Sequence, residues 1–112
     1  MARSATLGQF EQAVLLAVVH LEDDAYGVTI RRLIESRTKR PVSVGALYTA
    51  IDRLEEKGFV QSTMSDPTPA RGGRSKRHVR ITASGRRALR DAHRFFASLW
   101  AGLDWARLGR KG

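Results

Sequence analysis

The chain has 112 residues, of which twenty are Lys or Arg, eleven are Asp or Glu, and none is Cys. This length allows one domain with a small core, and the lack of cysteine excludes a disulfide framework, thiolate zinc sites and cysteine nucleophiles. No apolar run approaches the ~18 residues that cross a membrane, so we expect a single-domain cytoplasmic protein without a membrane partner.

The net charge of +9 is concentrated in the second part of the chain. Residues 1–65 carry eight basic and eight acidic side chains, whereas residues 66–112 carry twelve basic and three acidic ones. This imbalance indicates a polyanionic partner, with nucleic acid as the first candidate and an anionic membrane surface as the second. A basic surface kept for solubility is the simplest alternative, but the tight clustering of charge around Gly72 and Gly73 favours nucleic acid.

Three helices are predicted in the first half of the chain. Apolar residues spaced three and four apart predict a helix over residues 7–21. A second helix is expected over residues 25–38, and Pro41 prevents its continuation. Ser43 is expected to cap a third helix, which Gly58 closes. The short connection between the second and third helices is typical of a helix-turn-helix.

A two-stranded hairpin is predicted next, over residues 59–64 and 78–82. The segment 65–75 between the strands holds two prolines and two glycines, which indicates a long loop. The basic side chains in and just after this loop are Arg71, Arg74, Lys76 and Arg77. The predicted fold class is therefore mainly α with a two-stranded β-hairpin, as in a winged helix-turn-helix.

A final helix is predicted from a cap at Thr82 or Ser84 to about Leu108. Its apolar residues follow a heptad-like spacing at Leu89, Ala92, Phe96, Leu99, Leu103 and Ala106. The helix can fold back on its own core, but so small a core cannot cover the whole stripe. We therefore expect the distal part to meet a twofold partner while the proximal part stays with its own domain.

The predicted organisation is a winged helix-turn-helix DNA-binding domain over residues 1–83, followed by a C-terminal dimerisation helix and short basic tail over residues 84–112. The residues expected at the dimer interface are Leu7, Phe10, Val14, Phe96, Leu99, Trp100 and Leu103.

The third helix of such a fold enters the major groove of DNA. The small side chains of its first turn, residues 43–46, let the backbone approach closely. Gly45 weakens the helix by about 1 kcal/mol relative to alanine. Glycine is explained at this position if a larger side chain would clash with the DNA. Periodicity alone leaves Tyr48 open between a DNA contact and a core aromatic. The residues expected to contact DNA are Tyr26, Ser43, Val44, Gly45, Ala46, Tyr48, Thr49, Arg53, Arg71, Arg74, Lys76 and Arg77.

Three segments, residues 21–34, 44–60 and 72–85, resemble the PadR family of bacterial transcriptional regulators. The run Gly45-Ala46-Leu47-Tyr48 followed by Arg53-Leu54-Glu55 is quite specific, and the single C-terminal helix resembles the family's smaller branch. Where the family pattern has two aromatic residues after the basic loop, this chain has His78 and Val79.

The resemblance implies a repressor that binds a palindromic operator in double-stranded DNA as a homodimer, and it favours a DNA contact for Tyr48. In many family members a small molecule, often aromatic, releases the DNA. The candidate pocket for such an effector is lined by Phe95, Phe96 and Trp100, although plain interface packing also accounts for these rings.

No enzyme, cofactor or metal site is expected. The three histidines, His20, His78 and His93, are scattered, and none has metal-ligand spacing. No glycine-rich phosphate loop precedes a helix, and no nucleophile motif is present. The alternatives from other classes are a nonspecific nucleic-acid-binding protein and a winged-helix module that binds proteins.

Overall fold

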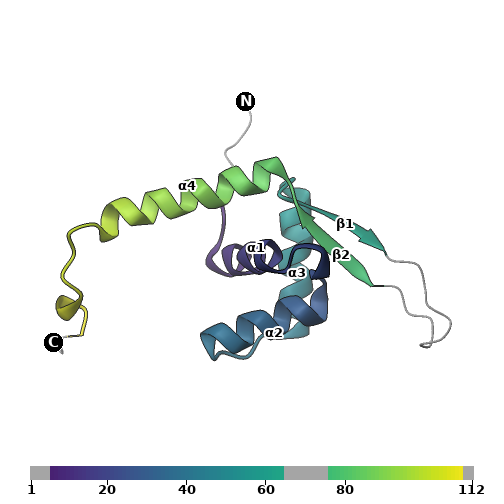
Figure 1. Ribbon diagram of the computed structural model, residues 1–112, viewed down its shortest axis with the longest axis horizontal. Coiled ribbons are helices and arrows are strands. Elements are labelled where there is room, and N and C mark those ends of the chain that lie inside the picture. Colours follow the sequence, from purple (N-terminus) through teal and green to yellow (C-terminus); the bar gives the residue numbers. More distant parts are fainter. Residues whose placement is uncertain (1–5, 65–75, 110–112) are drawn as a thin grey trace.

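The computed structural model describes residues 6–64 and 76–109, which form four α-helices, two short 3₁₀ helices and one β-hairpin (Figure 1). The elements in chain order are α1 (Gln9–Leu21), η1 (Glu22–Asp24), α2 (Gly27–Thr38), α3 (Val44–Glu56), β1 (Val60–Met64), β2 (Arg77–Ile81), α4 (Ala83–Trp100) and η3 (Trp105–Arg107). This order confirms the predicted fold class of a mainly helical winged helix-turn-helix.

One apolar core lies between α1, α2, α3 and the hairpin. Figure 1 shows α1 between α4 and α2, with the hairpin projecting from one end. The side chains of this core that are fully or nearly fully buried include Val14, Leu15, Val18, Ile30, Leu47, Ile51, Leu54, Val60 and Val79. Val14 has no exposed surface, which corrects its expected place at a dimer interface: the stripe of α1 that carries it faces the protomer's own core.

The two ends of α3 follow the sequence prediction. The Ser43 hydroxyl accepts a hydrogen bond from the backbone N–H of Ala46 at 3.1 Å, so Ser43 is the N-cap. At the other end, Gly58 follows the C-cap with a φ of +80°, a conformation that favours glycine. Both signals are local, which is why they could be read correctly.

The hairpin is antiparallel, and its pairs run from Val60 opposite Ile81 to Met64 opposite Arg77. Its second strand also contacts the start of α2. The backbone N–H of Val79 donates to the carbonyl of Ala25 at 2.9 Å, and the adjacent residues Tyr26 and His78 form an isolated bridge. Strand β2 therefore lies between β1 and the segment that enters α2.

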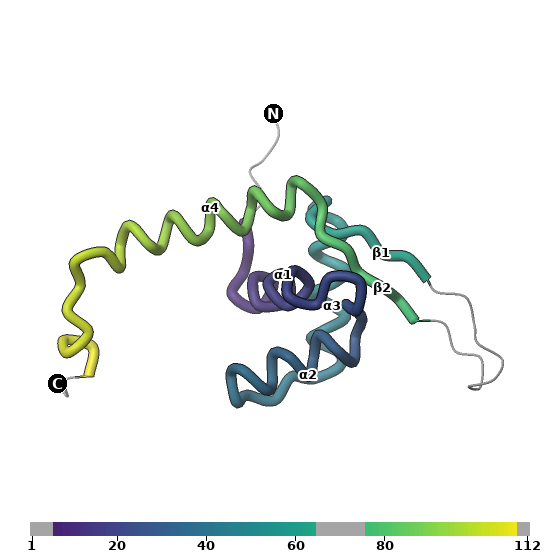
Figure 2. The backbone as a smooth tube through the Cα atoms, viewed as in Figure 1, coloured from purple at the N-terminus to yellow at the C-terminus, as the bar shows by residue number. Residues whose placement is uncertain are grey.

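Helix α4 begins where the sequence predicts, because the Thr82 side chain accepts from the backbone N–H of Gly85 at 3.0 Å. Its proximal residues Ala88 and Leu89 pack against the core. The helix ends at Trp100, eight residues before the predicted end at Leu108. The chain leaves helical geometry at Ala101, and Gly102 follows with a φ of +76°, so the chain bends away from the axis of α4, as Figure 2 shows.

A buried ion pair connects α1 to α3. The Glu11 carboxylate is 8% exposed and accepts hydrogen bonds from Lys57 at 2.7 Å and from the backbone N–H of Gly8 at 2.8 Å. Burial alone raises the pKa of Glu11. The bonds from Lys57 and Gly8, with the charges of Lys57 and Arg53, outweigh burial and leave the pKa below its ordinary value.

We predict that Glu11→Gln lowers the free energy of unfolding at pH 7 by about 1.5 to 3 kcal/mol, the usual range for a hydrogen bond to a charged group. A depressed carboxyl pKa stabilises the fold above the ordinary pKa of 4.5, and this contribution is lost as the pH falls through the lower, folded value. Urea denaturation at pH 7 and at acid pH measures both effects.

The control is Glu56→Gln, which changes an exposed carboxylate on α3. It should alter stability far less than Glu11→Gln at pH 7. A Glu11→Gln protein as stable as the wild type at pH 7, or equally destabilised at every pH, would contradict the role of this ion pair.

Candidate nucleic-acid interface

The first turn of α3 presents backbone and small side chains at the surface. Residues 43–46 are all exposed, and Val44 retains 51% of its accessible surface. A Cβ atom built on Gly45 meets no atom within 4 Å, so nothing inside the protein requires glycine at this position. The turn is therefore open to a ligand that approaches the helix N-terminus closely.

Tyr48 lies on the surface and not in the core. Its side chain is 38% exposed and lines a groove between α2 and α3 together with Val28 and Arg32. A Cβ atom on Gly27 would overlap with the Tyr48 hydroxyl, so the absence of a side chain there lets Tyr48 rest on the start of α2. The exposed position removes the core aromatic from the two alternatives that periodicity left open, and the DNA contact of Tyr48 stays a prediction.

Two further predicted residues of α3, Thr49 and Arg53, are exposed on another side of the helix. They line an open hollow of about 700 Å³ with Gly8, Phe10 and Lys57. The structure thus divides the predicted α3 residues between the exposed first turn, the groove against α2 and this hollow.

Tyr26, Lys76 and His78 form one cluster. The Lys76 ammonium donates to the Tyr26 hydroxyl at 3.3 Å and lies 4.4 Å from the centre of its ring. The His78 ring meets the Tyr26 ring edge-on, with centroids 5.5 Å apart. Fifty positions separate Tyr26 from Lys76 in the sequence, and the bridge between β2 and the start of α2 brings them together.

Arg77 points to the other side of β2, because successive side chains of a strand alternate between its faces. Its guanidinium lies 3.0 Å from Asp52 and 2.5 Å from Glu55, both on α3, and also donates to Ser62 at 3.0 Å. Partial burial lowers the pKa of Arg77, but the hydrogen bonds to Glu55 and Asp52 and the charges of both carboxylates outweigh it and raise the pKa above its ordinary value. The side chains of Arg77 and Lys76 therefore point to opposite sides of the hairpin, Arg77 toward α3 and Lys76 toward Tyr26.

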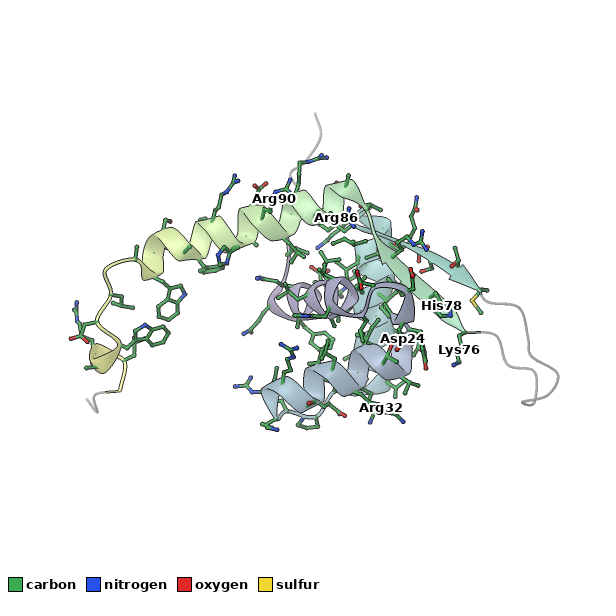
Figure 3. All side chains as sticks on the ribbon, in the orientation of Figure 1. Asp24, Arg32, Lys76, His78, Arg86 and Arg90 are labelled. Carbon is green, nitrogen blue, oxygen red and sulfur yellow. The ribbon has the colours of Figure 1, made fainter. Side chains whose placement is uncertain are left out.

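The other two basic residues predicted for the hairpin, Arg71 and Arg74, lie outside the described residues. Arg86 and Arg90 project from α4, whereas Lys76 and His78 lie at the hairpin and Arg32 on α2 (Figure 3). Arg86 lines a hollow together with Arg80 and Ile81 of β2.

The distal half of α4 carries apolar side chains that the protomer leaves exposed. Phe95 is 62% exposed, Phe96 52%, Leu99 65% and Trp100 43%. Leu103 is half-buried, and Leu7 and Phe10 are partly buried against the protomer's own core. Among the described residues, the exposed apolar side chains without a predicted role include Trp105 and Leu108 beyond α4, and Leu16 and Val19 on α1.

The aromatic rings of this region form two pairs. Phe95 and Phe96 meet edge-on with centroids 5.0 Å apart, and Trp100 stacks on Trp105 at 4.5 Å with only 11° between the ring planes. Trp105 was not expected here because a helix continued to Leu108 would carry it away. The turn at Gly102 folds it back onto Trp100.

The described part of the chain offers little for other chemistry. Within residues 6–64 and 76–109, no helix is long and apolar enough to cross a membrane. Over the same ranges, no three His, Asp or Glu side chains gather as ligands for a metal ion.

A helix-turn-helix followed by a hairpin that contacts both of its helices defines the class of winged helix-turn-helix proteins. The Transcriptional regulator PadR-like family matches residues 15–91, which is more than half of the chain. The protein therefore belongs to the PadR-like family of transcriptional regulators, which are DNA-binding regulators and not enzymes.

Solved structures agree with this assignment. RosR of H. salinarum is 27% identical with a TM-score of 0.67, and the match covers 90% of this chain and 84% of that one. A PadR family transcription regulator from Clostridium difficile R20291 is 25% identical with a TM-score of 0.64, over 83% and 95%. A PadR-like transcription factor from Bacteroides fragilis, 22% identical over 82% and 84%, supports the fold alone, with a TM-score of 0.71. No curated protein is a significant match.

Proposed function

We propose that this regulator is a repressor that binds a palindromic operator as a homodimer, with α3 in the major groove. The observation that carries the proposal is the continuous surface that joins α3 to the hairpin. Tyr48 of α3 rests on Gly27, the preceding residue is Tyr26, and the Tyr26 hydroxyl accepts a hydrogen bond from Lys76, the residue just before β2. A duplex on this surface meets the open turn at residues 43–46 and the hairpin together.

The proposed contacts follow from the chemistry of each group. The small residues 43–46 allow the α3 backbone close to base edges, and the hydroxyls of Tyr26 and Tyr48 can donate to phosphates. Lys76 neutralises a phosphate beside Tyr26. Arg71 and Arg74, which belong by sequence to the loop of the hairpin, are proposed for the adjacent minor groove, whose negative potential attracts arginine.

The dimer is proposed to form through the distal half of α4. A contiguous set of exposed apolar side chains on a soluble protein marks an interaction site. The helix carries them beyond the region where Ala88 and Leu89 pack on the protomer's own core. A second copy is the occupant we propose, because isologous twofold contacts are the commonest in soluble oligomers. Operator binding by such a dimer supports repression by occupation of promoter DNA, as the family resemblance implies.

We propose interface packing, and not effector binding, as the main role of the aromatic side chains Phe95, Phe96 and Trp100. One face of the Trp100 indole is already covered by Trp105. A planar aromatic effector would have to displace Trp105 to stack there. Titration with such compounds while tryptophan fluorescence is recorded separates the two roles, since only displacement changes the stacked pair.

The proposal predicts specific, salt-dependent binding to the DNA upstream of the protein's own gene. If each subunit neutralises about three phosphates, affinity falls about 10³-fold between 50 and 200 mM salt. Fluorescence anisotropy with labelled upstream DNA and an equal mass of random DNA as competitor measures both properties. Complete loss of the complex to random DNA would favour nonspecific binding, and no binding at low salt would favour a protein-interaction module.

The substitution Gly45→Ala should move stability and DNA binding in opposite directions. Alanine stabilises a helix interior by about 1 kcal/mol relative to glycine, and the added methyl group has open space in the free protein. Against DNA the same methyl is a small-to-large change in a close contact, and we expect about ten-fold weaker binding. Thermal melting and anisotropy measure the two effects. A more stable variant with unchanged DNA affinity would place this turn away from the duplex.

The substitution Leu99→Asp should convert the dimer to a monomer without unfolding it, because Leu99 is 65% exposed in the protomer and a charge there opposes only a partner. Sedimentation velocity measures the oligomeric state, and circular dichroism checks the helix content. Ser98→Asp, at the exposed neighbouring position, is the matched control and should leave the dimer intact. A Leu99→Asp protein that sediments as the wild type does would refute the proposed interface.

A further inference from the structure

Arg77 is held by its own protein at every nitrogen of its guanidinium group. Nη1 lies 3.0 Å from Asp52 and Nη2 lies 2.5 Å from Glu55, while Nε donates to the hydroxyl of Ser62. Ser62 in turn donates to Glu55 at 3.2 Å. Only 24% of the Arg77 side chain is exposed, whereas that of Arg80 on the same strand is 80% exposed.

This network joins the hairpin to the helix proposed to enter the major groove. Asp52 and Glu55 are three residues apart on α3, and the structure pairs both with Arg77 of β2. The Asp52 side chain remains 64% exposed, so its charge is felt by a ligand on this side of α3. Two unpaired carboxylates on that helix would repel a polyanion.

We propose that Arg77 is a positioning residue for DNA binding: it offsets one of the two negative charges of Asp52 and Glu55, holds the hairpin against α3, and makes no contact with the DNA itself. This inference rests on the proposed DNA-binding function and replaces the role that the sequence analysis gave to Arg77. Lys76, on the other face of the strand beside Tyr26, keeps its proposed phosphate contact.

Arginine suits this task because its planar fork reaches two carboxylates at once, whereas the compact ammonium of lysine acts as a single point charge. Arg77→Lys should therefore restore only part of the function. The loss of charge compensation, and not the loss of a phosphate contact, is what Arg77→Gln should reveal. If lost charge compensation weakens the binding of Arg77→Gln to DNA, neutral residues at positions 52 and 55 should restore it. If a lost phosphate contact is the cause, they should not.

The test is a double-mutant cycle measured by fluorescence anisotropy on the labelled DNA from upstream of the protein's own gene. We expect Arg77→Gln to weaken binding about ten-fold in the wild-type background. The coupling is the ratio of this loss to the loss in the second background, and residues of one ion-pair network usually show such coupling. In the Asp52→Asn/Glu55→Gln background, where no carboxylate needs compensation, the same change should weaken binding less than about three-fold. Equal losses in the two backgrounds, or no loss in either, would overturn the inference.

Lys76→Gln is the matched control, because it removes the positive charge adjacent to Arg77, just before the same strand. Because Lys76 is a proposed phosphate contact, Lys76→Gln should lower the DNA affinity by the same factor in both backgrounds. It should also reduce the slope of log affinity against log salt concentration by about one per subunit. Arg77→Gln in the neutral background should keep the salt slope of its parent. A reduced slope for Arg77→Gln there would mean that Arg77 does contact phosphate.

Thermal melting of each free variant separates a folding defect from a binding defect. If Arg77→Gln alone does not fold, Arg77→Lys takes its place in the cycle and is expected to show the same pattern with a smaller loss. Failure of the wild-type protein to bind the DNA at all would refute the proposed function. Wild-type binding without coupling between Arg77 and the two carboxylates would refute this inference alone.

Discussion

The backbone hydrogen bond from Val79 to Ala25 is the contact on which the arrangement of this protein depends. It places β2 between β1 and the segment that enters α2, so the strand belongs to the hairpin and to the helix-turn-helix together. Because side chains alternate along a strand, this placement sends Lys76 and His78 to Tyr26, and Arg77 to α3. An isolated hairpin is marginal in water, and here the core around Val79 stabilises it.

Charge is used differently on the two faces of this strand. On one face, Lys76 is beside a tyrosine hydroxyl and contributes to a surface suited to phosphate. On the other, Arg77 is bound by two carboxylates of α3, so this cluster keeps a net negative charge despite the arginine. The net charge of +9 is therefore a poor guide to which cations meet DNA.

The sequence predicted features that depend on local chemistry and missed those that depend on distant partners. The cap at Ser43 and the end at Gly58 could be read from neighbouring residues. A stripe spaced three and four apart does not say whether its partner is the protomer's own core, and so Val14 was placed wrongly. The pairing of Arg77 with Asp52 spans twenty-five positions and leaves no periodic signal.

The sequence predicted the start of helix α4 correctly but placed its end too late. Its periodicity predicted that the proximal part packs on the domain while the distal part leaves apolar residues for another surface. The same periodicity hid the turn after Trp100, where Ala101 leaves helical geometry and Gly102 has a positive φ. The stacking of Trp105 on Trp100 follows from that turn and could not be anticipated from a continuous helix.

The most direct test of this account is hydroxyl-radical footprinting of the protein on the DNA upstream of its own gene. A dimer that places two copies of α3 in successive major grooves predicts two symmetric patches of protection, separated by about one helical turn or a multiple of it. The hairpins should add protection of the minor groove beside each patch. Uniform protection along the fragment, or no protection at a concentration that shifts the DNA in a gel, would contradict the account.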